Sequence, residues 1–336
     1  MLLQGKNVLI TGADGFIGSH LTETLVKLGA NTRALISYNH FGSWGWLDHI
    51  EKDVLEEIDI YSGDICTFDS VLDAMSGCNI VFHLAALVGV PYSYRSPEAY
   101  LNTNIKGTMN VLQAAREIDI EKLIHTSSSE VYGTTRTVPI NEGHVTAAQS
   151  PYAASKIAAD QMALAYYHSF DTPVSIIRPF NTYGPRQTAS AIIPTIITQI
   201  TNDVNSIKLG STSPTRDFNY IEDTIRGFVA VAESDFSTGE IINIGSGYEI
   251  SIADTVKYIA DLMDKPINII QEDRRIRPYN SEVERLVADN TKAREMLNWS
   301  PHYAGVEGIK RGLRYTINWF SNPSNQKLYK NDVFCV

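Results

Sequence analysis

A tyrosine and a lysine spaced four residues apart could together perform acid–base chemistry. Tyr152 and Lys156 stand at the start of a segment, beginning near Ser150, whose pattern predicts a helix, so both side chains share one helix face. An ammonium group beside a phenol stabilises the phenolate and brings its pKa down from about 10 toward working pH. Tyr152 is therefore a candidate base for a substrate hydroxyl.

Two further reactive groups precede this pair in the sequence. Ser128 ends a predicted strand, HTSSSEVYG, where its hydroxyl could bind the same substrate oxygen, and Glu130 adds a carboxylate two residues later. Each group also has a structural explanation, since strand ends favour serine and a helical lysine is commonly solvated. The combination favours proton transfer at a hydroxyl-bearing carbon.

A glycine-rich turn follows the first predicted strand. Gly12, Gly15 and Gly18 lie in TGADGFIGSHL, immediately before a predicted helix. Glycine permits a positive φ, close approach of a pyrophosphate to the backbone, and tight helix–strand packing. The helix N-terminus would face the phosphates. The spacing predicts a dinucleotide site, although a tight turn would explain the glycines alone.

The segments expected at the adenosine end give a mixed signal. Many NAD-binding sheets carry an acidic residue at the end of the second strand, where this chain has Ile36 and Ser37, and no arginine pair follows for a 2′-phosphate. The choice between NAD and NADP therefore stays open. Asp64 could meet the adenine amino group while Ile65 covers the ring, but Asp64 could equally serve a turn.

Apolar runs alternate with helical patterns through the first half of the chain. Strands are predicted near 6–12, 31–37, 56–64, 79–86, 121–128 and 173–184, and helices over 17–28, 97–117 and from 150. This alternation predicts an α/β fold with a doubly wound parallel sheet. We expect residues 1–181 to form this domain, with 217–247 returning to it, and residues 182–216 and 248–330 to form a smaller lobe.

Composition excludes several classes of protein. The 336 residues are 43% hydrophobic, enough for a sizeable core and about two domains. A net charge of −10 argues against nucleic acid or an anionic membrane as the main partner. We see no signal peptide and no membrane-length apolar run, and the three cysteines lack metal-site spacing, so a cytoplasmic protein without a metal is expected.

The chain resembles the extended short-chain dehydrogenase/reductase family. The family's motifs occur in order along nearly the whole chain: TGADGFIG, GDI, VFHLAA, NTNIKGT, TSSSEVYG, YAASK, RPFNTYGPR, RDFNYIED and NIGSG. The resemblance implies a Rossmann domain with tightly held NAD, NADP being possible, and a C-terminal nucleotide-sugar lobe. It also implies that Ser128, Tyr152 and Lys156 are the catalytic trio.

The same resemblance implies the residues that contact each ligand. Cofactor contacts are implied for Gly12, Gly15, Phe16, Ile17, Gly18, Asp64, Ile65, Leu84, Ala85, Ala86, Asn104, Tyr152 and Lys156. Substrate contacts are implied for Asn181, Arg186, Arg216, Arg277 and Glu282. Arg216 and Arg277 are candidates for the diphosphate, because a guanidinium can pair with two phosphate oxygens.

The reaction within the family depends on Ser129 and Glu130, which we include among the catalytic residues. Sugar 4-epimerases usually carry a small neutral residue at position 130, whereas 4,6-dehydratases need a base for the C5 proton. The dTDP-glucose dehydratases have Asp at position 129, so Ser129 followed by Glu130 is more similar to GDP-mannose dehydratases. UDP-glucuronate decarboxylases also carry Ser-Glu here, so the pair leaves both reactions open.

Three further stretches refine the resemblance. YNHFGSWGWLDHI, RSPEAYLNTN and RPYNSEVERLVAD resemble the GDP- or UDP-N-acetylglucosamine 4,6-dehydratases of legionaminic acid biosynthesis. Phe41, Trp44 and Trp46 in the first stretch would form either a self-packed Ω-loop or a lid on the substrate side. The helices after Pro97 and Ser150 commonly form the dimer interface in this family, so a homodimer is expected. A non-catalytic dinucleotide sensor is the remaining alternative, against which the intact trio argues.

Overall fold

The computed structural model describes residues 3–135, 137–202 and 205–329. Cys335, the first two residues of the predicted dinucleotide domain and residue 330 at the end of the predicted lobe lie outside these ranges. No helix in the described ranges has both the length and the apolar character needed to cross a membrane.

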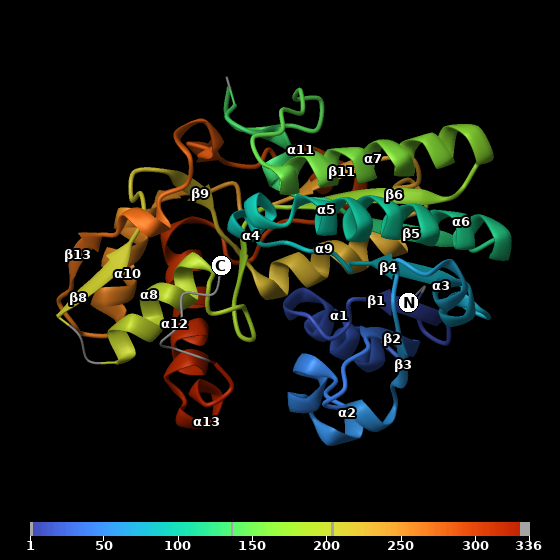
Figure 1. Ribbon diagram of the computed structural model, residues 1–336, viewed down its shortest axis with the longest axis horizontal. Helices are drawn as coiled ribbons and strands as arrows, with labels where there is room; N and C mark the ends of the chain where they lie inside the picture. Colours follow the sequence, from blue (N-terminus) through green and yellow to red (C-terminus); the bar gives the residue numbers. More distant parts are fainter. Residues whose placement is uncertain (1–2, 136, 203–204, 330–336) are drawn as a thin grey trace.

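A parallel sheet forms the centre of the larger domain. Within the described residues it has seven strands in the order β11-β6-β5-β4-β1-β2-β3. The strands are β1 (Asn7–Thr11), β2 (Asn31–Ser37), β3 (Asp59–Gly63), β4 (Ile80–His83), β5 (Lys122–Thr126), β6 (Val174–Pro179) and β11 (Ile241–Ile244). Figure 1 shows helices above and below this sheet. The predicted doubly wound α/β fold is confirmed.

Alternate residues of each central strand enter different cores. In β1, Ile10 packs with Leu25 of α1 (Phe16–Lys27) and Phe228 of α9 (Ile221–Glu233). Leu9, which points the other way, packs with Leu112 of α6 (Thr108–Ile118) in the cluster that also includes residues of α3 (Phe68–Met75) and α7 (Pro151–Phe170). Both faces of the sheet are therefore covered, and the carboxyl ends of its strands are left for ligands.

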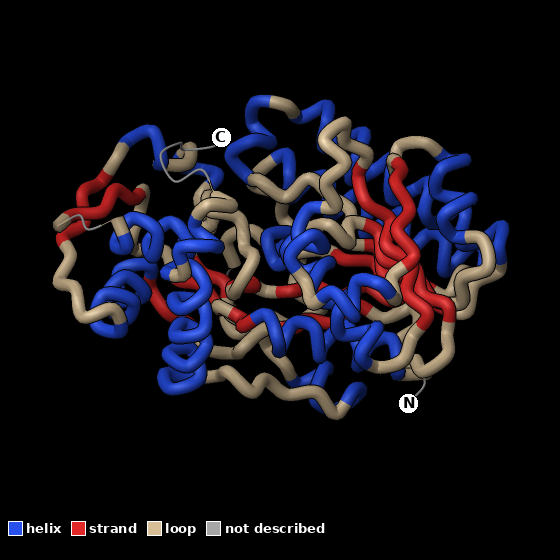
Figure 2. Tube along the Cα trace, turned by 90° about the horizontal axis from the view of Figure 1, so that it is seen from below, coloured by secondary structure: helices blue, strands red, loops and turns tan. Residues whose placement is uncertain are grey.

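The remaining elements build a second lobe beside the strand ends, best separated in Figure 2. They include α8 (Ile192–Thr201), β8 (Ser206–Leu209), β9 (Thr215–Asp217), β12 (Glu249–Ser251), α10 (Ile252–Leu262), β13 (Asn268–Gln271), β14 (Arg285–Leu286), α12 (Gly305–Ser321) and α13 (Pro323–Gln326). The helix α11 (Thr291–Leu297) instead packs against β11 of the main sheet. Short elements elsewhere are α2 (Lys52–Glu56), α4 (Val90–Arg95), β7 (Thr182–Tyr183) and β10 (Asn219–Tyr220). Because β11 pairs with β6, the segment between the two lobe pieces reaches the main sheet. The exact domain limits stay a prediction.

The predicted helix over 97–117 is interrupted by a wide turn. It consists of α5 (Pro97–Tyr100), a π-helical segment (Leu101–Gly107) and α6. A π-helical segment accommodates an extra residue, and such segments are frequent at functional sites. Here it contains Asn104, whose amide binds both Leu87 and Ser155. The amide thereby joins the loop after β4 to the first turns of α7.

The aromatic loop after β2 lies against the C-terminal helices. The ring of Trp46 is 6.2 Å from that of Trp319 in α12 and 5.4 Å from that of Tyr329. Phe41 is 82% exposed. The loop therefore owes its position to contacts with a distant segment, which neither alternative from the sequence included.

Candidate active site

The predicted catalytic trio meets where β5 ends and α7 begins. Ser128 caps the 3₁₀ turn Ser129–Tyr132, and its hydroxyl accepts a 3.2 Å hydrogen bond from the Glu130 backbone N–H. The Ser128 side chain also lies close enough to Tyr152 to favour the ionised form of its phenol. The N-cap of α7 is Ser150, which accepts from Ala153 N–H at 3.1 Å and fixes the first turn of the helix. The two reactive segments are thus anchored by local capping bonds.

Lys156 is held on the same face of α7 as Tyr152. Its Nζ donates a 2.8 Å hydrogen bond to the backbone oxygen of Thr126, at the end of β5. Burial lowers the pKa of Lys156 to about 8, against an opposing effect of Asp160. Burial raises the pKa of Tyr152, and the neighbouring Ser128 side chain opposes this. The phenol is protonated in this state, so forming the phenolate requires additional positive charge beside it.

A buried charged cluster lies one helical turn beyond Lys156. Asp160 Oδ2 accepts bonds from Arg178 at 2.8 Å and Ser127 at 2.8 Å, and its Oδ1 is 3.3 Å from His125 Nε2. Burial would raise the pKa of Asp160, but the neighbouring His125 ring and the Arg178 charge outweigh it, so this pKa is lowered. The sequence analysis missed Asp160, although the spacing of Tyr152, Lys156 and Asp160 places all three on one face.

The two strand histidines differ in how their rings are satisfied. His83 hydrogen-bonds Thr11 at 2.8 Å and Thr108 at 2.9 Å, and burial lowers its pKa well below the usual value. Both ring nitrogens of His125 lack a hydrogen bond of ordinary geometry, and its nearest charged neighbour is Asp160. Among the described residues, no group of three His, Cys, Asp or Glu could hold a metal ion.

The glycine loop forms a cradle that side chains would fill. Gly12 has φ +70°, and a Cβ there would lie 2.8 Å from Ala85 Cα. A Cβ on Gly18 would lie 2.1 Å from Gly12 O, while Gly15 is the N-cap of α1. The first turn of α1, with Phe16 and Ile17, therefore opens directly behind a surface of bare backbone. These residues fit a dinucleotide pyrophosphate.

The other predicted cofactor residues surround this loop. Leu84 and Ala85 donate backbone N–H bonds to Thr11 Oγ1 at 3.2 and 3.1 Å, so the segment with Ala86 leaves β4 beside the glycines. Ile65 is buried against Gly107. Asp64 is exposed and accepts a 2.8 Å bond from Cys66 N–H. That bond is a turn contact, and it leaves a second carboxylate oxygen for adenine.

The predicted substrate-binding part of the site contains two arginines and two glutamates. Arg216 NH2 donates to Glu282 Oε1 at 3.0 Å. Arg277 NH1 lies 3.9 Å from Glu130 and 3.8 Å from Glu282, and this nitrogen has no hydrogen bond of ordinary geometry. Burial lowers the pKa of Arg216, with Glu130 opposing. Segments far apart in sequence therefore bring Glu130 and both guanidinium groups together.

Three other predicted residues have contrasting surroundings. Asn181 Oδ1 is buried and has no hydrogen-bond partner among the described residues. Ser129 is buried in the 3₁₀ turn next to Ser128. Arg186 has φ +66° and pairs with Glu23 of α1 at 2.5 Å, and its contact with substrate stays a prediction.

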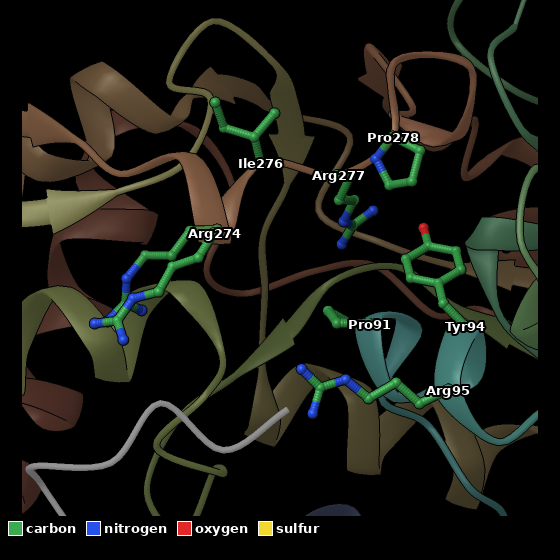
Figure 3. Close-up of a pocket in the computed structure, with 8 residues that line it drawn as sticks. Pro91, Tyr94, Arg95, Arg274, Ile276, Arg277 and Pro278 are labelled. Carbon is green, nitrogen blue, oxygen red and sulfur yellow. The ribbon is translucent and has the colours of Figure 1, made fainter.

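A pocket opens next to Arg277. It is lined by α4 and by the segment around Arg277 (Figure 3). Its lining is Pro91, Tyr94, Arg95, Arg274, Arg275, Ile276, Arg277 and Pro278. Tyr94 also hydrogen-bonds Ser281 at 2.5 Å across the two segments. The abundance of arginine suits an anionic ligand.

This combination of fold and site has a family counterpart. The model of the GDP-mannose 4,6 dehydratase family matches residues 9–312. The chain belongs to this family of nucleotide-sugar dehydratases and epimerases.

Its relatives perform more than one reaction. The UDP-glucose 4-epimerase of Mycolicibacterium smegmatis is 32% identical over 94% of this chain and 99% of its own. A UDP-N-acetyl-alpha-D-glucosaminuronate decarboxylase of Bacillus cytotoxicus is 32% identical over 95% of this chain and 99% of its own. The structure of DesIV, a dTDP-glucose 4,6-dehydratase from Streptomyces venezuelae with NAD bound, superposes with a TM-score of 0.83 at 25% identity, covering 96% and 99% of the two chains. The family is therefore established. The family alone does not determine the reaction, because its members include an epimerase, a decarboxylase and a dehydratase.

Proposed function

We propose that this protein is an NAD-dependent 4,6-dehydratase acting on GDP- or UDP-linked N-acetylglucosamine. Its product would be the 4-keto-6-deoxy sugar, as in legionaminic acid biosynthesis. The observation that carries the proposal is the position of Glu130. Its backbone N–H is bonded to Ser128, and its carboxylate lies close enough to Tyr152 to help raise the pKa of that phenol, so a carboxylate adjoins the proposed alcohol-oxidising pair. A dehydratase needs this second base, whereas an epimerase does not.

NAD, when bound, supplies the acceptor for the C4 hydride and returns that hydride to C6. The glycine cradle, Asp64, Ile65, Leu84, Ala85, Ala86 and Asn104 would hold it. NADP is the alternative cofactor. Since a hydride returned in every cycle leaves no need for exchange, the protein should retain its cofactor through purification.

The residues of the trio would perform the alcohol oxidation. Tyr152 takes the C4 hydroxyl proton while Ser128 hydrogen-bonds the same oxygen. The ammonium group of Lys156, one helical turn away, stabilises the phenolate. Its bond to Thr126 O fixes the ammonium without neutralising its charge.

Glu130 would carry out the elimination. Oxidation at C4 acidifies the C5 proton, which Glu130 accepts. The same carboxylic acid then delivers a proton to the departing C6 hydroxyl, so water leaves and Glu130 is ionised again. Return of hydride to C6 requires a proton at C5, and the proton that Tyr152 took from the C4 hydroxyl, after exchange with solvent, balances that step. Arg216 and Arg277 would bind the diphosphate, with Asn181 and Glu282 completing the substrate contacts.

A 4-epimerase and a UDP-glucuronate decarboxylase are the alternatives. A UDP-glucose 4-epimerase and a UDP-N-acetyl-alpha-D-glucosaminuronate decarboxylase are relatives that match nearly the whole chain. Mass spectrometry of products from a panel of nucleotide sugars separates the reactions. A dehydratase product has lost water, a decarboxylase product has lost carbon dioxide, and an epimer has unchanged mass. We expect loss of water from an N-acetylglucosamine nucleotide, and either other result would contradict the proposal.

We also propose a cytoplasmic homodimer formed through the exposed sides of α6 and α7. These helices contact one another and expose Met109 and Phe170, with the Arg116 guanidinium 4.1 Å from the Phe170 ring centre. Exposed apolar side chains on adjacent helices suit a helical interface. Light scattering that gives the mass of one chain at micromolar concentration would contradict the dimer.

A further inference from the structure

The carboxyl end of β2 offers no acidic side chain of its own for an adenosine ribose. Ile36 is buried there, and Ser37 ends the strand. The Asn39 amide is engaged by Ser43, donating to its backbone oxygen at 2.7 Å and accepting from its N–H at 3.2 Å. Asp48 accepts bonds from the Ser43 hydroxyl at 2.7 Å and Trp44 N–H at 3.0 Å. The polar side chains of this loop therefore hold the loop itself.

Asp14, from the glycine loop, brings a carboxylate to this strand end. The N–H groups of Gly12 and Ala13 donate to Leu35 O at 3.0 and 3.4 Å, which holds the glycine loop against β2. Asp14 follows directly in this loop, and its Cβ would lie 2.9 Å from a Cβ added to Gly45. Burial raises the pKa of Asp14, while the nearby backbone N–H groups of Asp14 and Ser37 oppose this and favour the ionised form. The carboxylate thus lies beside the end of β2, where the second strand normally supplies an acidic side chain.

The aromatic loop fixes the backbone of Asp14. Trp46 N–H donates to Asp14 O at 3.0 Å, and a Cβ on Gly45 would lie 2.6 Å from that oxygen. Trp46 is in turn packed against Trp319 and Tyr329. Asp14 is therefore held between the strand end and a loop braced by the C-terminal helices, and it has little freedom to withdraw from a larger ligand.

We propose that Asp14 selects NAD over NADP, its carboxylate accepting hydrogen bonds from the adenosine ribose hydroxyls and repelling a 2′-phosphate. The inference rests on the dinucleotide site of the proposed function and is independent of the reaction. Residues 35–50 contain no Lys or Arg to neutralise a phosphate. Like charges brought together at a binding surface lower affinity by roughly 10- to 1,000-fold.

The test measures cofactor retained, not turnover. Purified protein is first stripped of its resident dinucleotide by charcoal treatment and then incubated with equimolar NAD and NADP. Unbound nucleotide is removed by gel filtration, the protein is denatured, and the released dinucleotides are quantified by chromatography. We expect at least ~30-fold more NAD than NADP from the unchanged protein, and a ratio below ~5 from Asp14→Asn, which keeps the shape but loses the charge. Asp14→Ser provides a second neutral variant should Asp14→Asn fold poorly.

Asp48→Asn is the matched control, because it removes a neighbouring loop carboxylate bonded within the loop, and it should keep the selectivity of the unchanged protein. A preference for NADP in the unchanged protein would overturn the proposal, as would full NAD selectivity in both Asp14 variants. Loss of selectivity in Asp48→Asn equal to that in Asp14→Asn would also overturn it, since the loop would then be responsible. Failure of the unchanged protein to retain either dinucleotide would contradict the proposed function itself.

Discussion

The Arg277 guanidinium lies 3.9 Å from the Glu130 carboxylate and 3.8 Å from that of Glu282. Glu282 also accepts a hydrogen bond from Arg216. A diphosphate carries more negative charge than either carboxylate, so it would compete for both guanidinium groups. We therefore expect substrate binding to weaken the hold of Arg277 on Glu130, which couples occupancy of the diphosphate site to the availability of the base.

Replacing Glu130 with Gln should separate the two half-reactions. The amide keeps the size of the side chain but cannot accept the C5 proton, so C4 oxidation proceeds while elimination stalls. Product formation should fall by at least ~100-fold. Reduced nicotinamide should accumulate in its absorbance band when substrate is mixed with the variant.

Deuterium labelling gives an independent reading of the same substitution. In D₂O the unchanged protein should place deuterium at C5 of the product, whereas Glu130→Gln should leave C5 of recovered substrate largely unlabelled. Glu282→Gln is the control, since it too faces Arg277 but lies outside the Ser128 and Tyr152 contacts, and its effect should fall mainly on KM. Wild-type product release by Glu130→Gln would remove the main support for a dehydratase.

Replacing Tyr152 with Phe should remove C4 oxidation and leave substrate binding nearly unchanged. Only the phenolic oxygen is lost, and a missing general base costs about 100-fold or more in turnover. Tyr100→Phe is a matched control, because the two rings are 6.2 Å apart and the Tyr100 hydroxyl instead bonds Gly89 O. Comparable turnover in the two variants would show that another group takes the proton.

The alternation of strands and helices was predictable because buried parallel strands read as short apolar runs and glycine marks the turn behind the first of them. The π-helical segment at 101–107 could not be predicted, because one extra residue barely alters the hydrophobic pattern of a helix. Arg186 shows a different limit. A motif fixes its position in the chain, but the left-handed backbone that turns its side chain to Glu23 is a tertiary property.

The missed carboxylates had usable signals. Asp160 continues the four-residue spacing of Tyr152 and Lys156, but no sequence pattern indicates that Arg178 and His125 surround it. Asp14 is visible inside the glycine motif, yet its role depends on which strand end the loop contacts. In both cases the role depends on which distant backbone lies next to the side chain. Hydrophobic periodicity carries no information about such tertiary neighbours.

Replacing Gly18 with Ala should damage both folding and cofactor retention. The new Cβ would lie 2.1 Å from Gly12 O, an atom of backbone that has little freedom to move. Such overpacking costs about 1–3 kcal/mol of unfolding free energy. Gly143→Ala, where the nearest atom is a side-chain oxygen at 3.4 Å, should be close to neutral. Thermal melting and measurement of bound dinucleotide would check both, and an unaltered Gly18→Ala protein would contradict the tight cradle.

The lowered pKa of Lys156 predicts that turnover and stability respond oppositely to alkaline pH. The ammonium form is the one that stabilises the Tyr152 phenolate, so turnover should fall as pH rises through about 8, where burial places this pKa. The unfolded chain has a lysine pKa near 10.4, so between these values it binds more protons than the folded protein. The contribution of Lys156 to the unfolding free energy therefore increases over the same range.

Asp160→Asn tests the origin of this predicted fall in turnover at alkaline pH, the alkaline limb of the pH profile. The Asp160 charge raises the Lys156 pKa, so removing it should move the fall in turnover to lower pH. The matched comparison is Lys122, whose pKa burial also lowers to about 8 but whose Nζ bonds Ser234 O, away from the trio. Lys122→Met should leave the position of the limb unchanged.

Chemical denaturation at each pH distinguishes loss of the catalytic charge from unfolding. An alkaline limb that does not move in Asp160→Asn would show that Lys156 does not set it.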